Sequence, residues 1–183
     1  FVGAQVHSQL SQEKIFIPAA GSEALADPAI KPYLTKYGGQ QLTTGAQAKA
    51  YADHFILVHM KAASGGKTYA ELGGDQTALK AKIAAAKAAN QPTTALDDQL
   101  TTLNGTRQTL FMGNTLRGLL LNAYAFGTMG TIAGIAAIGA FIAAGVMALL
   151  SGLGLWHSGR AKGSERELTA PAGSGSREPV AVA

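Results

Sequence analysis

The feature that most constrains this chain is an uncharged segment from Gly118 to Trp156, which contains no Asp, Glu, Lys, Arg or His. A helix that crosses a bilayer needs roughly 20 mostly apolar residues, because each residue adds about 1.5 Å to its length. The part from about Met129 to Trp156 meets this requirement and is predicted to be a transmembrane helix. Trp156 lies at its end, where aromatic rings favour the headgroup region.

Two arrangements of this segment are compatible with its length. Residues 118–128 could form the juxtamembrane part of one long helix, or the first arm of a tight helical hairpin. No cluster of turn residues divides the segment, and its length barely holds two spans and a turn. We therefore predict a single span, with residues 118–157 as a juxtamembrane and transmembrane helix.

Composition narrows the classes of function. Only 14% of the 183 residues are charged, compared with about 25% in an average soluble domain. The net charge of +4 is not concentrated in any block, so the pattern does not indicate a nucleic-acid-binding surface. Cysteine is absent, which excludes disulfide bonds, thiolate metal sites and cysteine nucleophiles.

The N-terminal residues resemble a helix that leaves a membrane. The sequence begins FVGAQVHSQL without an initiator Met, and the apolar residues 1–6 give way to the polar residues 7–14. We expect residues 1–6 to be the end of a first transmembrane helix that lies mostly upstream of residue 1. The alternative is the frayed N-terminus of a processed protein. Pro18 disfavours helical geometry at Ile17, so the helix is expected to end there.

Residues 7–117 are predicted to form a small helical extracytoplasmic domain. The Gly- and Pro-rich residues 19–41 indicate a loop with one short helical turn. Thr43 or Thr44 is expected to cap a helix that ends at Ser64.

Two glycines are predicted to divide the next helical segment. Gly73 and Gly74 should stop a single turn formed by residues 68–72. Asp75 should then cap an Ala- and Lys-rich helix that ends near Asn90 and lies on the domain surface.

A third helical pattern leads into the uncharged segment. A row with a period near 3.6, in which Arg107 is the one polar member, consists of Leu96, Leu100, Leu103, Arg107 and Leu110. With a bend at Gly113 and Asn114, it should enter the bilayer as one long helix or two nearly collinear ones. The predicted fold class is therefore an all-α membrane protein: a helical extracytoplasmic domain followed by a C-terminal transmembrane helix.

Charges beside the span predict its orientation. Positive residues accumulate on the cytoplasmic side of plasma-membrane spans. Arg107 and Arg117 precede the span; the positive residues that follow it are His157, Arg160, Lys162 and Arg166. This bias places the C-terminus in the cytoplasm, with residues 158–183 as a flexible tail rich in Gly, Ser and Pro.

Small residues within the span predict a helix-packing surface. Small side chains at four-residue spacing let a second helix backbone approach closely. The predicted packing residues are Gly130, Gly134, Ala136, Ala140, Ala144, Ala148 and Gly152. The partner would be the first span or a helix of another subunit, and Asn122 and Tyr124 could hydrogen-bond across that contact.

Catalytic and cofactor signals are weak, so we expect no cofactor. His54 and His59 are five residues apart, whereas two metal ligands from one helix are usually three or four apart. Residues 64–68 read SGGKT but lack the first glycine and the preceding strand of a phosphate-binding loop.

Four segments carry a resemblance to a known family: VHSQLSQEKI (6–15), TGAQAKAYADHF (44–55), ASGGKTYAEL (63–72) and TLFMGNTLRGLLLNAY (109–124). Together they resemble a family of small actinobacterial membrane proteins, and the resemblance covers most of the chain apart from the tail. It implies two spans that flank a helical extracytoplasmic domain. Family members are often labelled aromatic ring-opening dioxygenases, which hold non-haem iron with histidines and a carboxylate.

These observations favour a non-catalytic accessory subunit of a larger envelope or respiratory complex in the plasma membrane. Its partners would be other membrane protein subunits and the lipid bilayer. The alternative is a metal- or quinone-dependent membrane enzyme that uses His54 and His59. A third hypothesis is a free-standing homo-oligomer or sensor.

Overall fold

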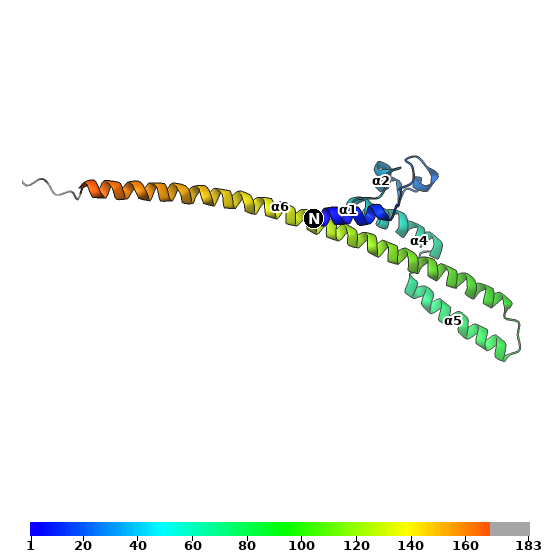
Figure 1. Ribbon diagram of the computed structural model, residues 1–183. Helices are drawn as coiled ribbons and strands as arrows, with labels where there is room; N and C mark the ends of the chain where they lie inside the picture. Colours follow the sequence, from blue (N-terminus) through cyan, green and yellow to red (C-terminus); the bar gives the residue numbers. More distant parts are fainter. Residues whose placement is uncertain (169–183) are drawn as a thin grey trace, which may run out of the picture. The chain divides into compact units, whose positions relative to one another are not determined.

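The computed structural model describes residues 1–168, with side chains up to residue 160 (Figure 1). The elements in chain order are α1 (Val2–Gln12), η1 (Glu23–Leu25), α2 (Lys31–Leu34), η2 (Thr35–Tyr37), α3 (Gly45–Tyr51), η3 (Ala52–Ile56), α4 (Leu57–Ser64), α5 (Tyr69–Ala88) and α6 (Thr94–Leu168). Short 3-10 helices form η1 and η2, and η3 is a π-helical turn. The described residues contain no strand, only an isolated bridge between Phe16 and Gln41, so the prediction of an all-helical chain is confirmed for them.

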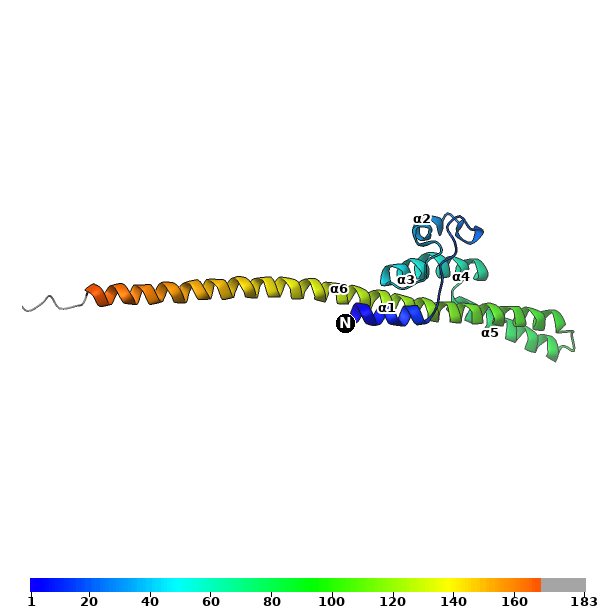
Figure 2. The ribbon, with the colours of Figure 1, turned by 45° about the horizontal axis from the view of Figure 1, so that its top comes forward.

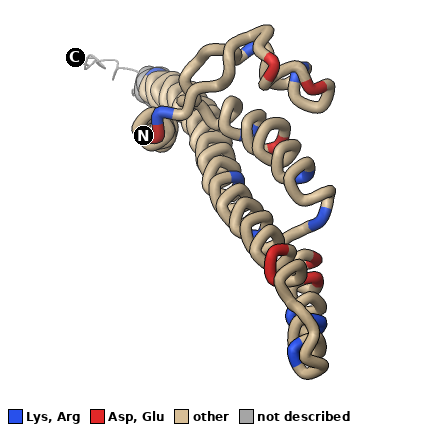
Figure 3. Tube along the Cα trace, turned by 90° about the vertical axis from the view of Figure 1, so that its right-hand side faces the viewer, with Lys and Arg blue, Asp and Glu red and all other residues tan. Residues whose placement is uncertain are grey.

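The chain divides into two compact units. The first comprises Phe1–Ala133, and the second begins at Gly134. α6 is one continuous helix that contributes to both. Within the first unit, Figures 1 and 2 show α1 and α5 alongside α6. Acidic and basic residues are interspersed along this unit (Figure 3).

α1 ends earlier than the proline rule predicted. The helix stops at Gln12, and Lys14 adopts a left-handed conformation with φ of 51°. The backbone of residues 15–17 is extended because it pairs with residues 40–42: Ile17 N–H donates to Gln40 C=O over 3.0 Å, and Leu42 N–H donates to Ile15 C=O over 2.8 Å. The prediction that helix continues to Ile17 is therefore wrong.

The predicted loop of residues 19–41 holds more structure than one turn, namely η1, α2 and η2. It builds a small hydrophobic cluster that packs on α3 and η3; its buried members are Ile17, Leu25, Ile30 and Leu34. Gly38 allows the two ends of this segment to approach closely, because a Cβ at position 38 would lie 2.5 Å from the backbone N of Ala20.

The helix predicted from Thr43 or Thr44 to Ser64 is confirmed as α3, η3 and α4. Thr44 caps it with a reciprocal pair: its hydroxyl accepts the Gln47 N–H over 3.3 Å, while the Gln47 side chain accepts the Thr44 N–H over 3.0 Å. Gly65 ends α4 with φ of 61°. The interior π turn, closed by Leu57 N–H donating to Ala52 C=O, did not follow from the sequence pattern.

The predicted break at Gly73 and Gly74 is wrong, because α5 passes through both. Thr68 and Glu71 form a capping box that starts the helix. A Cβ at Gly73 would lie 3.6 Å from the Arg107 guanidinium, which places this glycine beside α6. Asp75, predicted as a cap, lies inside α5 and pairs with Lys67 over 2.6 Å.

Replacing Gly74 with Ala is expected to stabilise α5 by about 0.5–1 kcal/mol, because Gly is the weaker helix former and this site has open space. Thermal unfolding of the solubilised protein would show a higher midpoint. Gly65→Ala is the control and should lower the midpoint, because Ala is strained at the φ of 61° that residue 65 adopts. A lower midpoint for Gly74→Ala would contradict the assignment of Gly74 to a helix interior.

The prediction of one unbroken helix rather than a helical hairpin is confirmed: α6 has no turn between Gly118 and Trp156 and contains Gly113 and Asn114 without interruption. The segment Thr94–Arg160 is long and apolar enough to cross a membrane. The helix extends to Leu168, into the segment predicted as a tail; residues 158–168 are rich in helix-forming Arg, Ala, Lys and Glu. Residues 169–183 lie outside the described part of the chain.

Candidate functional site

The predicted packing residues of α6 have different environments. A Cβ at Gly130 would lie 3.0 Å from the Val2 Cβ of α1, so Gly130 is a close-contact position. A Cβ at Gly134 or Gly152 would meet nothing within 4 Å. The four predicted alanines, Ala136, Ala140, Ala144 and Ala148, are exposed in the described chain. Of the predicted set, Gly130 alone is in helix–helix contact among the described residues.

α1 and α6 form an antiparallel helix pair in the first unit. Val2 lies against Gly130, and a Cβ at Gly127 would be 4.0 Å from Val6. Further along α1, Leu10 belongs to the same buried cluster as Leu120. Gly127 was not among the predicted packing residues, although Val2, Val6 and Leu10 at four-residue spacing could have indicated an apolar stripe on α1.

α3 also approaches α6 closely, a few residues before Gly127. A Cβ at Gly45, the first residue of α3, would lie 3.1 Å from the Tyr124 Cα. Because that neighbour is backbone, it cannot move aside as a flexible side chain can. Glycine at position 45 therefore allows α3 to approach α6 here.

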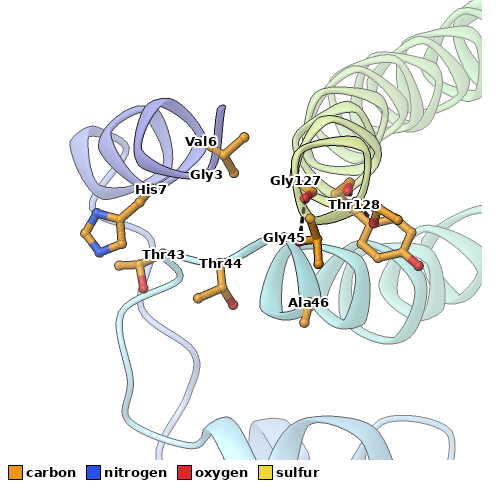
Figure 4. A pocket seen from close by; sticks show the side chains of 11 residues that line it. Gly3, Val6, His7, Thr43, Thr44, Gly45, Ala46, Gly127 and Thr128 are labelled. Atoms are coloured by element: carbon orange, nitrogen blue, oxygen red, sulfur yellow. Dashed lines mark hydrogen bonds between the residues drawn. The ribbon is translucent and has the colours of Figure 1, made fainter. Parts of the chain in front are cut away.

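A pocket of about 360 Å³ opens where α1, α3 and α6 meet (Figure 4). Its lining residues are Gly3, Val6, His7, Thr43, Thr44, Gly45, Ala46, Tyr124, Gly127, Thr128 and Thr131. The Thr128 and Thr131 hydroxyls donate to the Tyr124 and Gly127 carbonyls over 2.9 and 3.0 Å. With those protons engaged and glycines on three elements, the pocket has the character of a small-residue packing groove.

Asp53 of η3 is the centre of an ionic cluster with Lys49 and Arg117. Its carboxylate accepts hydrogen bonds from Lys49 over 2.5 Å and from Arg117 over 2.8 Å. The Lys49 ammonium also lies 5.6 Å from the centroid of the Tyr124 ring. Arg117 is the last charged residue before the uncharged segment, so the cluster connects η3 to α6 directly before that segment. The i,i+4 spacing of Lys49 and Asp53 could have predicted that these two residues pair. No feature of the sequence indicated that Asp53 also pairs with Arg117.

The hydrogen bond from Lys49, followed by that from Arg117, holds the pKa of Asp53 below its usual value of 3.8, while burial opposes the shift. The folded state therefore binds fewer protons than the unfolded state, so the contribution is present above about pH 4 and is lost as the pH falls through the lowered pKa.

Asp53→Asn is expected to destabilise the protein by about 1–2 kcal/mol at pH 7, because Arg117 loses its charged partner. The difference from the parent protein should shrink as the pH approaches 3, as measured by unfolding midpoints across this range. The exposed pair of Lys67 and Asp75 supplies the control: Asp75→Asn should leave the unfolding midpoint nearly unchanged, because water screens this pair. Equal changes in stability for the two substitutions would contradict a stabilising ion pair between Asp53 and Arg117.

The two histidines of the alternative enzyme hypothesis have separate partners. The His54 ring stacks on Tyr33, with centroids 3.4 Å apart. His59 pairs through Nδ1 with the Phe55 carbonyl oxygen over 2.8 Å. Within the part of the chain that the structure describes, no three His, Asp or Glu side chains are grouped as metal ligands.

The SGGKT segment is a helix–helix connection. Ser64 ends α4, and the Glu71 carboxylate already accepts the Thr68 N–H over 2.7 Å at the start of α5. Lys67 is paired with Asp75. The amide and the lysine that would face a phosphate are thus engaged within the chain.

Over the described residues 1–168, the fold and these contacts define a class of protein: an all-helical chain with one helix long and apolar enough to cross a membrane. Comparison of the sequence and structure with protein-family models, curated proteins and solved structures finds no match.

Proposed function

We propose that this chain is a non-catalytic integral membrane protein of the plasma membrane, and that it acts as an accessory subunit of a larger envelope or respiratory complex. The observation that carries the proposal is the exposure of α6: residues 131–156 are all exposed within this chain although the segment is apolar. Water would disfavour such a surface, so lipid or other helices must cover it.

The composition of α6 suits contact both with lipid and with other helices. Large side chains that suit lipid, such as Ile135, Phe141 and Leu149, are between 67% and 79% exposed. Between them lie the alanines and glycines that allow close helix contact in a membrane. A membrane anchor with no helix partner would not need those small residues.

The α1–α6 pair supports a first span. A helix that continued α1 in the N-terminal direction would run antiparallel to α6 beyond Gly130. Two transmembrane helices would then flank the helical domain, as the resemblance to the actinobacterial family implies. The family assignment itself is part of the proposal.

A substitution pair tests this first span. Counted along α6, Gly134 lies about 40° from Gly130 and Gly139 about 180° from it, at 3.6 residues per turn. Gly134→Leu in the full-length protein should lower the thermal midpoint, by an amount equivalent to about 1–3 kcal/mol of overpacking. Gly139→Leu should have little effect. The opposite ranking would contradict a first span on this side of α6.

Orientation follows from charge. The positive residues after the span favour a cytoplasmic C-terminus and an extracytoplasmic first unit. Trp156 and Arg160 form an interfacial pair, with the guanidinium 4.3 Å from the ring centroid. Such a pair suits the headgroup region at the end of a span.

The experiment that tests the accessory role is purification of the tagged full-length protein from native membranes in a mild detergent. Mass spectrometry and metal analysis would follow. We expect the subunits of one larger complex to co-elute in fixed proportion. A protein that elutes without partners and carries about one transition metal per chain would contradict the proposal and return His54 and His59 to consideration.

A further inference from the structure

Arg107 is a cation in the row of residues by which α6 packs on α5. The next members of that row, Leu103 and Leu110, belong to the hydrophobic cluster of α5 and α6. The Arg107 guanidinium lies 4.5 Å from the centroid of the Tyr69 ring, and its Nη1 donates to the side-chain oxygen of Gln76. A Cβ at Gly73 would lie 3.6 Å from its Nη2. The guanidinium therefore lies across α5 at a position where that helix has no side chain.

Arg107 differs from the other Lys and Arg side chains of residues 1–117. The nine lysines of this range are all exposed, whereas Arg107 and Arg117 are half-buried. Arg117 has an acidic partner, because its Nη2 donates to the Asp53 carboxylate over 2.8 Å. Within the described residues, Arg107 forms no ion pair, and its one hydrogen-bond partner is the neutral Gln76. Its Nη2 has no acceptor there.

Packing between α5 and α6 does not explain an arginine at this position. Taking a cation partly out of water is unfavourable unless a carboxylate compensates it, and an apolar side chain is often at least as stabilising at such a site. Leucine occupies the neighbouring positions of the row. A guanidinium matches a carboxylate through two parallel hydrogen bonds. An acidic group from outside the chain would supply the interaction that Arg107 lacks.

Two exposed aromatic rings lie beside Arg107. Tyr69 is 40% exposed and Phe111 is 55% exposed, although they contact each other with ring centroids 6.3 Å apart. Aromatic residues and Arg are enriched at protein–protein interfaces and among the residues that dominate binding energy. Arg107 lies 11 residues before Gly118, which is about 16 Å along the helix. This distance from the uncharged segment favours a protein partner over a lipid headgroup.

We propose that the surface formed by Tyr69, Arg107 and Phe111, here called the Arg107 surface, binds an acidic side chain of another protein subunit. An Asp or Glu of that subunit pairs with the guanidinium, and apolar residues around it cover the two aromatic rings. This inference rests on the proposed function, because it names the surface through which the accessory subunit contacts its complex outside the membrane.

A carbodiimide cross-link tests the chemistry of this contact directly. In Arg107→Lys, an amine replaces the guanidinium. A carbodiimide joins such an amine to a carboxylate in direct contact: an amide bond forms, and the carbodiimide takes up the water that is lost. In native membranes that contain the full-length variant, position 107 should become linked to an Asp or Glu of a foreign peptide, identified by mass spectrometry. Thr102→Lys is the matched control, because residue 102 is exposed about 140° round α6 from residue 107 and should give no foreign product.

A charge exchange separates binding from a structural role of Arg107. Arg107→Glu should reduce recovery of the cross-linked subunit with the tagged chain about tenfold, as expected for loss of a dominant contact. Replacing the identified acidic residue of that subunit with Lys should restore recovery, which a merely structural role would not permit. Phe111→Ser should also lower recovery, whereas Met112→Ser should not, although Met112 is 59% exposed. Thermal midpoints show whether each variant is folded.

Several results would overturn this inference. A product that joins position 107 to a carboxylate of the same chain, a second copy or a lipid headgroup would do so, and so would no product. Full recovery of the subunits by both Arg107→Glu and Phe111→Ser would overturn the docking surface but leave the accessory role intact. If the parent protein itself recovers no subunits, the accessory role fails, and this inference fails with it.

Discussion

A chain that carries Ile138→Arg and Ile142→Arg is expected to lose its membrane insertion. Both isoleucines belong to the uncharged segment and are 63% and 64% exposed, so neither arginine would find a partner within this chain. Each Arg near the centre of a span disfavours insertion by about 2.5–3.5 kcal/mol on the translocon scale. Together they would offset much of the apolar contribution of α6.

Extraction of membranes with sodium carbonate measures this effect, because integral proteins resist it. The parent protein should remain in the pellet, and the double variant should move to the supernatant or be degraded. Ala81→Arg combined with Ala85→Arg is the matched control, since both positions are exposed on α5 and should leave extraction unchanged. Full retention of the Ile138/Ile142 variant would contradict a span centred on these residues.

Leu110→Ala is expected to destabilise the first unit by about 2–5 kcal/mol, the range for removing a buried leucine side chain. Leu110 is 2% exposed and belongs to the cluster that joins α6 to α1, α3, α4 and α5 through Leu10, Ala48, Met60 and Leu72.

The measurement is the thermal or denaturant unfolding of the full chain in detergent. Leu116→Ala provides the comparison, because Leu116 is on the same helix but 39% exposed. Its substitution should have a markedly smaller effect. Similar losses for the two leucines would indicate that α6 does not form the core contact through Leu110.

Local signals were sufficient for much of the fold. The Thr44 cap, the end of α4 at Gly65 and the unbroken helix through Gly118–Trp156 each depend on a few neighbouring residues. Such features are encoded by capping chemistry and hydrophobic length, which a single sequence displays directly.

Features that depend on distant contacts were not predictable in the same way. α5 continues through Gly73 and Gly74, whose combined preference against helix is outweighed by the capping box and by packing on α6. α1 stops early because residues 15–17 pair with residues 40–42. In both cases a tertiary contact overrides a local preference.

In the candidate packing site, too, residues with a local signal were predicted and residues that depend on distant contacts were not. Gly130 was identified from its spacing, and the structure gives it a partner in Val2. Gly127, Gly45 and the ion pair of Asp53 with Arg117 were missed, because each depends on residues brought together from separate helices. The packing role stays a prediction that needs a partner helix for Gly134, Ala136, Ala140, Ala144, Ala148 and Gly152.

The central claim, that α6 crosses the membrane between the first unit and the C-terminus, is tested most directly by cysteine accessibility in intact cells. The chain has no native cysteine, so Thr101→Cys and Ser158→Cys each introduce a single thiol at an exposed position. A membrane-impermeant maleimide should label position 101 in intact cells and position 158 only after the membrane is permeabilised. Labelling of both positions from the same side would contradict a single span and the orientation proposed for it.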